Sequence, residues 1–139
     1  MPLTMDKAAL DAFLVEQFPQ VAEEFVIDAV EENALKLRLV VSERHLRPGG
    51  TVSGPAMFGL ADVGVYLAIL AMIGPRALAV TTNCSIDFLR KPAAERDLLA
   101  EVRLLKLGRL LATGDVLLHS VGRDAPVARA TLTYAIPPA

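Results

Sequence analysis

The sequence is poor in the residues that build disulfide frameworks and metal sites. It contains one cysteine, no tryptophan and two histidines, His45 and His119, which lie far apart in the chain. A single thiol excludes an intrachain disulfide and a cysteine-rich metal motif, so we expect neither a metal nor another cofactor. The formal net charge of -2 lacks the basic excess that is typical of nucleic-acid-binding proteins. The first ten residues lack the charged and apolar regions of a signal peptide, which favours a cytoplasmic protein.

One long apolar run dominates the chain. It covers residues 54–74, and Asp62 is the only charged residue within it. Apolar side chains occupy the whole helical circumference, which predicts a helix buried on every side. Pro55 suits the first helical position, and Ser53 or Gly54 can cap the helix.

A membrane span is the alternative interpretation of this run, since about 20 apolar residues can cross a bilayer. Asp62 would then lie in lipid, where a carboxylate is costly. Arg47 and Arg76 flank both ends, so no charge asymmetry orients such a span. The strand-like segments that follow also need this helix as their core, and we therefore expect no membrane partner.

Alternating apolar and polar residues predict antiparallel strands on both sides of the apolar run. A first helix, capped by Thr4 or Asp6 and ended by Pro19, precedes them, and a loop covers residues 42–53. In the strand that follows the apolar run, strict alternation places Thr81 and Cys84 on opposite faces. The expected strands span residues 25–30, 34–41, 77–89, 98–105, 110–120 and 127–136.

These elements predict a single α+β domain over residues 1–139. A helix that is apolar all round must be covered by other elements, and the flanking strands are the only segments available to cover it. We therefore expect a strongly curved antiparallel β-sheet around a long central helix. The edges and the second face of such a sheet favour contact with a partner subunit.

Asp62 and Gly54 are the first candidates for chemistry. A carboxylate in an apolar helix is either satisfied structurally by a neighbour or retained as a base or nucleophile. Gly54 lies at the helix N-terminus, where a free N–H can stabilise an oxyanion, although the glycine could also serve only a tight turn. Asp62 lies eight positions after Gly54, a separation of roughly 12 Å along a helix. A site that uses both groups would therefore combine two subunits.

Several motifs resemble a known family. Residues 44–55 read Arg-His-Leu-Arg-Pro-Gly-Gly-Thr-Val-Ser-Gly-Pro and are followed by Leu-Ala-Asp at 60–62. With Ile-Asp-Phe-Leu-Arg-Lys-Pro at 86–92 and Gly-Arg at 108–109, they resemble the hot-dog-fold acyl-CoA thioesterases of the phenylacetate-pathway (PaaI-type) group. The resemblance covers most of the chain. It implies a hot-dog fold, an acyl-CoA substrate, and a homodimer or a tetramer built as a dimer of dimers.

The resemblance also implies roles for individual residues. Asp62 would be the base for water or the nucleophile, Gly54 the oxyanion donor, and the Thr81 hydroxyl would help to hold the water. Residues that match the family's cations near coenzyme A are Arg90, Lys91, Lys106 and Arg109, although charges beside turns are often merely solvated. The helix residues expected to line an apolar or aromatic acyl pocket are Met57, Phe58, Val65, Tyr66 and Ile69.

Three positions depart from the family pattern. Arg47 replaces an asparagine or glutamine, Ser53 a histidine, and Pro55 the second glycine. Arg47 could hold an acidic acyl group or pair with Asp62 of the partner subunit, which leaves a non-catalytic acyl-CoA or lipid-binding protein as the second hypothesis. A hot-dog hydratase or dehydratase would use a histidine about one turn after the helix aspartate, or a histidine and an acidic residue across the site. No histidine follows Asp62 in the helix, which disfavours this class.

Overall fold

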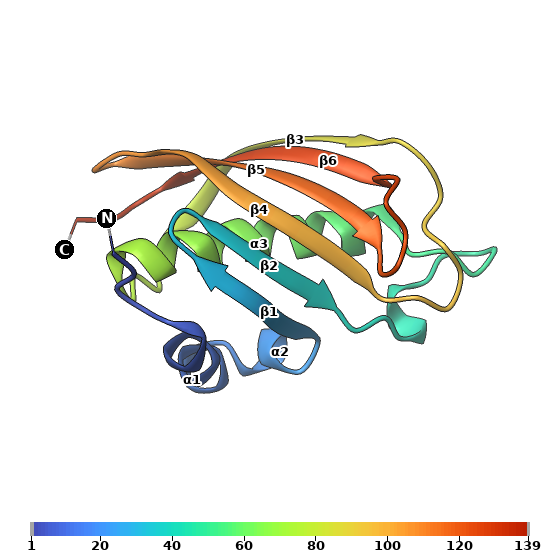
Figure 1. Cartoon of the computed structure of the whole chain (residues 1–139), viewed down its shortest axis with the longest axis horizontal. Coiled ribbons are helices and arrows are strands. Elements are labelled where there is room, and N and C mark those ends of the chain that lie inside the picture. Colours follow the sequence, from blue (N-terminus) through green and yellow to red (C-terminus); the bar gives the residue numbers. More distant parts are fainter. Residues whose placement is uncertain (1, 139) are drawn as a thin grey trace.

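Six antiparallel strands form one sheet that curves around the long helix α3 (Figure 1). This computed structural model describes residues 2–138. The strand order is β1-β2-β4-β5-β6-β3, which leaves β1 and β3 at the edges. The elements are α1 (Lys7–Gln17), α2 (Pro19–Ala22), β1 (Phe25–Glu31), β2 (Ala34–Leu39), the 3-10 helix η1 (Glu43–His45), α3 (Gly54–Ile73), β3 (Val80–Phe88), β4 (Leu98–Leu107), β5 (Leu111–Ser120) and β6 (Ala128–Ala135). The predicted α+β hot-dog architecture is confirmed.

Two short helices were not predicted from the sequence. Pro19 ends α1 as expected, but it also begins α2, because proline is tolerated in the first turn of a helix. The 3-10 helix η1 lies within the predicted loop over residues 42–53. Asp6 caps α1 by accepting a hydrogen bond from the Ala9 N–H at 2.9 Å.

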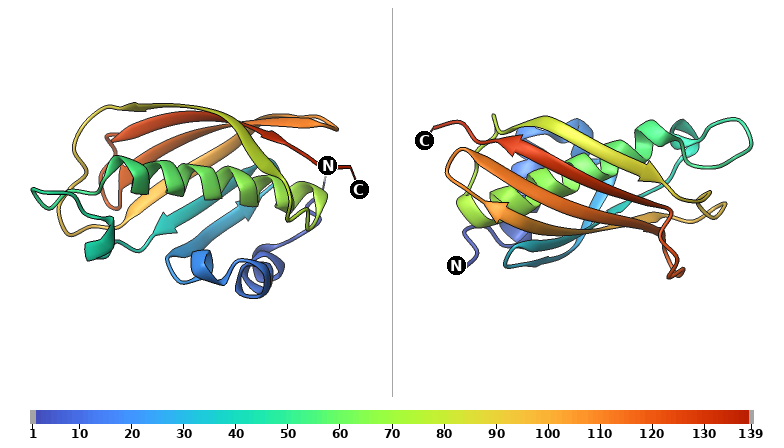
Figure 2. Two further views of the ribbon diagram at one scale, coloured as in Figure 1. Left: turned by 180° about the vertical axis from the view of Figure 1, so that it is seen from behind. Right: turned by 90° about the horizontal axis from the view of Figure 1, so that it is seen from above.

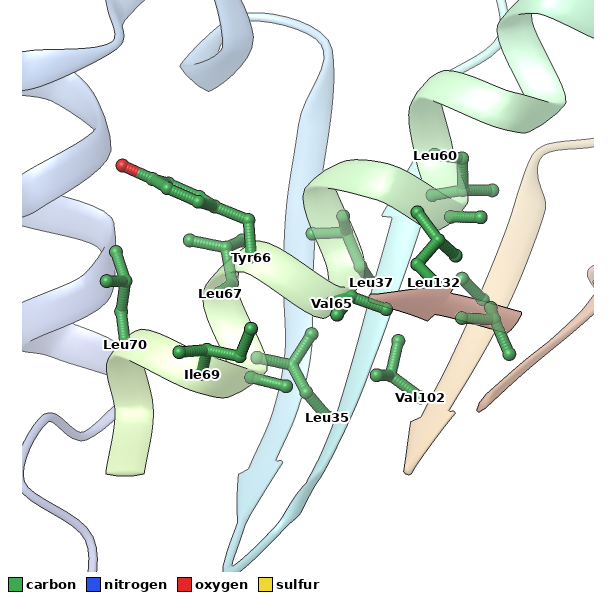
Figure 3. Close-up of a cluster of buried hydrophobic side chains, with 14 of the residues drawn as sticks. Leu35, Leu37, Leu60, Val65, Tyr66, Leu67, Ile69, Leu70, Val102 and Leu132 are labelled. Atoms are coloured by element: carbon green, nitrogen blue, oxygen red, sulfur yellow. The ribbon is translucent and has the colours of Figure 1, made fainter. Parts of the chain in front are cut away.

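Helix α3 supplies one side of the hydrophobic core. Ser53 caps its first turn by accepting a hydrogen bond from the Ala56 N–H at 3.3 Å, and Gly74 ends it with φ of 94°, a conformation that favours glycine. The side chains that interdigitate in the core are Leu60, Val65, Leu67, Ile69 and Leu70 of α3 with Leu35, Leu37, Val102 and Leu132 of the sheet (Figure 3).

The N-terminal half of α3 is not buried on every side, and the expectation of complete burial was wrong there. Helix α3 runs along the open side of the curved sheet (Figure 2), and one sheet covers only the face that it contacts. The residues of α3 that stay exposed or half-exposed on the other face are Pro55, Phe58, Gly59, Asp62 and Val63, which we call the open stripe. Phe58 is 36% exposed despite its apolar ring. An apolar stripe of this kind marks a surface suited to a partner.

By length and composition alone, α3 could cross a membrane, since its mean hydropathy is 2.1. However, 67% of the apolar window is buried inside the molecule. The core helix of a soluble protein meets the same criteria. Its burial against the sheet therefore agrees with the interpretation of α3 as a core helix.

Gly64 lies where α3 packs closely against β4. A Cβ added there would lie 2.8 Å from Val102 Cγ2, and a buried valine has little rotameric freedom to move away. Gly64→Ala is therefore expected to lower the free energy of unfolding by up to about 2 kcal/mol, because overpacking outweighs the gain in helix propensity.

Urea denaturation at fixed protein concentration measures this effect. In a Val102→Ala background the clashing methyl group is absent, so the same Gly64→Ala change should become neutral or stabilising. Equal destabilisation in both backgrounds would contradict the close-contact explanation.

Candidate active site

The Asp62 carboxylate is held on one side only. Its Oδ1 accepts hydrogen bonds from the Thr81 hydroxyl and, at 2.7 Å, from the Tyr134 hydroxyl, which also lies 3.0 Å from the Asp62 carbonyl oxygen. Its Oδ2 has no hydrogen-bond partner among residues 2–138 and is not sealed from solvent. The carboxylate therefore presents one fixed oxygen and one free oxygen.

A bulge in β3 brings Thr81 to Asp62. The pairing of β3 with β6 shifts register between Thr81 and Asn83, so the alternation of side chains is interrupted at Thr82. Thr81 and Cys84 consequently both face inward, and the prediction that they lie on opposite faces was wrong. Tyr134 is paired directly with Thr81 across the two strands, which explains why their hydroxyls converge on one carboxylate oxygen.

The titratable neighbours of Asp62 stay neutral. Burial, together with the negative charge of Asp62, raises the pKa of Tyr134 well above its usual range, so this phenol acts as a hydrogen-bond donor. Burial and the same charge raise the pKa of the Cys84 thiol, which disfavours the nucleophilic thiolate. Burial also raises the pKa of Tyr66, whose hydroxyl donates to the Ala77 carbonyl at 3.1 Å.

Asp62 opens into a cavity of ≈ 340 Å³ with mostly apolar walls. Tyr66, which we expected from the sequence to line an acyl pocket, lines this cavity. Phe18 also lines it, with its ring edge-on to Tyr66 at a centroid distance of 6.3 Å. The remaining wall residues are Val63, Ala77, Ala79, Val80, Thr81 and Tyr134. We call this cavity the Asp62 pocket.

Gly54 opens into a second cavity, of ≈ 680 Å³, which we call the Gly54 pocket. Among residues 2–138 the Gly54 N–H has no acceptor, as expected at the start of a helix. The Phe88 ring packs closely over Gly54, since a Cβ added to the glycine would lie 3.3 Å from Phe88 Cζ. The predicted site residues that share this pocket are Arg47, Met57, Arg90 and Lys91.

Arg47, Arg90 and Lys91 are all exposed, so this pocket carries cations at its rim. The Arg90 guanidinium also donates to the Pro126 carbonyl, which fixes its direction. Ser53 is used as the helix cap, as the sequence predicted, through its hydrogen bond to Ala56.

Other predicted site residues lie elsewhere. Arg109 lines a third cavity beside Ile73 and Arg76, at the C-terminal end of α3, and Lys106 is exposed on the neighbouring end of β4. Phe58 lies on the open stripe and outside both pockets. Val65 and Ile69 are fully buried against the sheet, so the prediction that these two line the acyl pocket was wrong. Their apolar character reflects the core.

Sequence analysis missed Tyr134 and Phe18. A buried tyrosine needs a partner for its hydroxyl, so the single tyrosine of the last strand was a usable signal for a nearby acceptor. Phe18 gave no such signal, since its place depends on how α1 ends. Within residues 2–138 no cluster of His, Cys, Asp or Glu could hold a metal ion.

Residues 49–127 match the family model of the thioesterase superfamily. The chain belongs to the thioesterase superfamily. A structure from Silicibacter sp. TM1040, provisionally named a thioesterase, is similar at 62% identity, with a TM-score of 0.93 over 99% of this chain and 96% of that one. The mutant phenylacetic acid degradation protein PaaI of Thermus thermophilus is similar at 27% identity, with a TM-score of 0.72 over 85% of this chain and 97% of that one.

A Pseudomonas aeruginosa protein, provisionally named an esterase, is 32% identical over 89 residues. That match spans 64% of this chain and 66% of the relative, just under two thirds of its length. Together with the superfamily match, these similarities identify a hydrolase, a hot-dog thioesterase of the PaaI type.

Proposed function

We propose that this superfamily member hydrolyses an acyl-CoA with a small or medium acyl or aryl group, in sites shared by two subunits. Asp62 of one subunit acts as base or nucleophile, and the Gly54 N–H of the other stabilises the oxyanion. The observation that carries the proposal is the separation of the two groups on one helix. The Asp62 pocket lacks Gly54, and the walls of the Gly54 pocket include no carboxylate.

A second copy of the chain would complete each site. The open stripe of α3 contains Asp62 and begins beside Gly54, and the edge strand β3 offers unpaired backbone groups and exposed apolar residues, such as Val80 and Phe88. A two-fold axis beside α3 and perpendicular to it would set two such helices antiparallel. Asp62 of each subunit would then lie near Gly54 of the other. We propose a homodimer, or a tetramer of two such dimers.

The chemistry follows from the free groups. Oδ2 of Asp62 takes a proton from water as the water oxygen attacks the thioester carbonyl, while Thr81 and Tyr134 keep Oδ1 in place. The carbonyl oxygen becomes an oxyanion, which the Gly54 N–H and the positive end of α3 stabilise. Collapse of the tetrahedral intermediate breaks the C–S bond and releases coenzyme A as the thiolate. Alternatively, Oδ2 attacks the carbonyl carbon itself, the C–S bond breaks and coenzyme A leaves as the thiolate. Water then hydrolyses the resulting anhydride to the free acid and the Asp62 carboxylate.

The two pockets suit the two parts of the substrate. The cations of the Gly54 pocket, Arg47, Arg90 and Lys91, match the phosphates of coenzyme A. The aromatic walls of the Asp62 pocket, Phe18 and Tyr66, suit an apolar or aromatic acyl group. Lys106 and Arg109 line neither pocket, so a contact with coenzyme A would require another subunit.

One observation favours a second function. Arg47 is an exposed cation in the Gly54 pocket, so in the dimer it could pair with Asp62 of the partner subunit. Such a pair would occupy the free carboxylate oxygen and leave a protein that binds acyl-CoA without turnover. Calorimetric binding of an acyl-CoA by a protein that releases no thiol would support this alternative.

Paired mutant subunits test the shared site. Asp62→Asn and Gly54→Pro are placed either on different chains of a doubly tagged heterodimer or together on one chain beside a wild-type partner. If each site uses two subunits, the first arrangement keeps one intact site and about half of the wild-type hydrolysis rate. The second arrangement disables both sites, so hydrolysis is lost.

The pattern reverses if each site lies within one chain. The heterodimer with both changes on one chain would then keep half of the activity, and the other heterodimer would keep none. The two heterodimers contain the same mutations in the same number, so each serves as the control for the other. Tandem affinity purification followed immediately by a thiol-release assay limits subunit exchange.

A further inference from the structure

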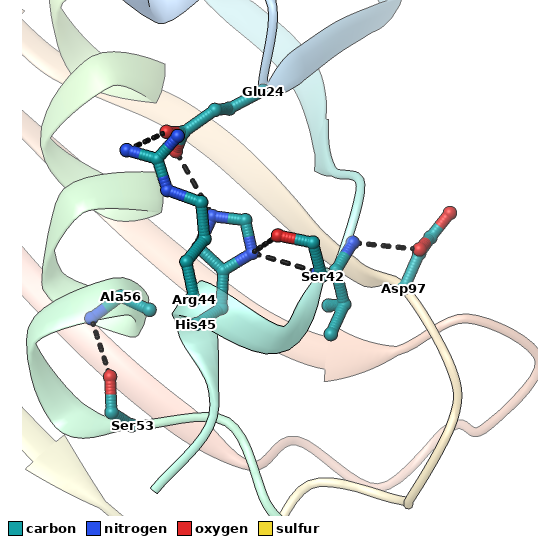
Figure 4. Close-up of polar contacts among 8 residues, drawn as sticks. Glu24, Ser42, Arg44, His45, Ser53, Ala56 and Asp97 are labelled. Carbon is teal, nitrogen blue, oxygen red and sulfur yellow. Dashed lines mark hydrogen bonds and ion pairs between the residues drawn. The ribbon is translucent and has the colours of Figure 1, made fainter.

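His45 is buried at the end of η1, and its hydrogen bonds define the tautomer of its ring. It is 7% exposed, and its Nδ1 lies 2.9 Å from the Ser42 backbone N–H (Figure 4). A backbone N–H can only donate, so Nδ1 must be the acceptor and the ring proton sits on Nε2. Nε2 lies 3.0 Å from Glu24 Oε2 and donates to it. Both ring nitrogens of His45 therefore make hydrogen bonds.

The carboxylate that receives this proton is anchored to the sheet. Glu24 directly precedes β1, and its carbonyl accepts the Val40 N–H at 2.9 Å. Its second carboxylate oxygen pairs with Arg44 Nη2 at 2.9 Å. On the other side, Asp97 at the start of β4 accepts the Val41 N–H at 3.0 Å. The base of η1 is thus tied to three strands.

The other end of the same network reaches α3. The His45 carbonyl accepts the Ser53 N–H at 2.8 Å, and Ser53 caps α3 through its hydroxyl. The segment between them folds back on itself, with Leu46 bridged to Val52. Its tip is exposed, and Gly49 and Gly50 have φ of 99° and 79° there. The tip has little packing of its own to fix the direction of the chain that enters α3.

We propose that His45 is a positioning residue that holds Ser53, and through it the Gly54 N–H, in the direction needed to stabilise the oxyanion. This inference rests on the proposed role of Gly54. Loss of the ring leaves the Ser42 N–H and Glu24 Oε2 without their shared partner, while Glu24 Oε1 keeps Arg44. The first turn of α3 then gains freedom of orientation. The oxyanion exists only after attack on the carbonyl, so the turnover number falls while substrate binding changes little.

Three variants test the role. His45→Ala removes both ring contacts, whereas His45→Asn keeps an acceptor at the position of Nδ1. His119→Ala is the matched control, because His119 makes a similar pair with Glu101 and lines neither the Asp62 pocket nor the Gly54 pocket. We expect His45→Ala to lower kcat by about 10- to 100-fold, while KM stays within about twofold of the wild-type value. His45→Asn should recover most of the lost kcat. His119→Ala should leave both constants unchanged.

Amide hydrogen exchange tests the same role without activity. In His45→Ala, peptides over residues 52–57 should exchange at least about tenfold faster, while peptides over 65–73 stay protected. If His45→Ala does not fold, His45→Gln replaces it, since the longer amide no longer accepts from Ser42. Unchanged exchange and kcat, or exchange that rises equally along all of α3, would overturn the inference. A wild-type protein without hydrolysis would refute the proposed function alone, because the exchange result stands independently.

Discussion

Asp62→Asn is expected to lower kcat for acyl-CoA hydrolysis by about 10²- to 10⁴-fold, the range over which general bases contribute. The amide has nearly the same shape as the carboxylate, and its oxygen can still accept from Thr81 and Tyr134. The fold and the pocket should therefore persist while the basic oxygen is lost. Release of the coenzyme A thiol from a panel of straight-chain and aryl acyl-CoA substrates measures the effect.

Asp115→Asn supplies the matched control for this change. Asp115 is exposed on β5 and accepts a hydrogen bond from the Thr131 hydroxyl at 2.9 Å, so it too is a carboxylate held by a threonine. It lines neither of the two pockets in which we place the substrate. Its replacement should leave hydrolysis unchanged. Equal turnover in wild-type protein and Asp62→Asn would exclude Asp62 as base or nucleophile.

Gly54→Pro is expected to lower kcat by about 10²- to 10³-fold, since loss of one oxyanion donor has this effect in other hydrolases. Proline deletes the N–H, and the first position of a helix accepts it. Ser53, with φ of -74° and ψ of 157°, already has the extended conformation required before proline. The substitution therefore removes one donor with little strain in the backbone.

Gly54→Ala distinguishes the effect of losing the N–H donor from the effect of adding a Cβ. Both substitutions add a Cβ that would meet the Phe88 ring at 3.3 Å, but only alanine keeps the N–H. The ratio of kcat between the alanine and proline variants thus reports the hydrogen bond. If the alanine variant is as slow as the proline variant, the close approach of Phe88 matters and the donor does not. If both are as fast as wild type, Gly54 has no role in the reaction.

The sequence was sufficient for the fold because its signals are local. The apolar run of α3 and the alternation in the strands each follow from a single periodicity, and one curved sheet is the simplest cover for such a helix. Asp62 and Gly54 could be selected for similar reasons, as a carboxylate in an apolar run and a glycine at a helix start. The structure places both on α3 as expected.

Contacts between distant segments escaped prediction. Tyr134 lies 72 residues after Asp62, and the two meet only because β6 is paired with β3. The bulge after Thr81 puts the Thr81 and Cys84 side chains on the same face of the sheet, and nothing in the composition of β3 indicates it. The exposure of the open stripe could not be predicted for a different reason. Apolar residues that face a partner subunit are of the same types as apolar residues that face the core.

The strand order also constrains when this protein can fold during synthesis. Strand β3 leaves the ribosome directly after α3, yet within residues 2–138 its only neighbour in the sheet is β6, the sixth strand in chain order. Until residue 135 has emerged, β3 has no strand of its own chain to pair with, and Thr81 is not fixed beside Asp62. The environment of the Asp62 carboxylate is therefore completed only when β6 pairs with β3, a long-range pairing of the kind that slows folding.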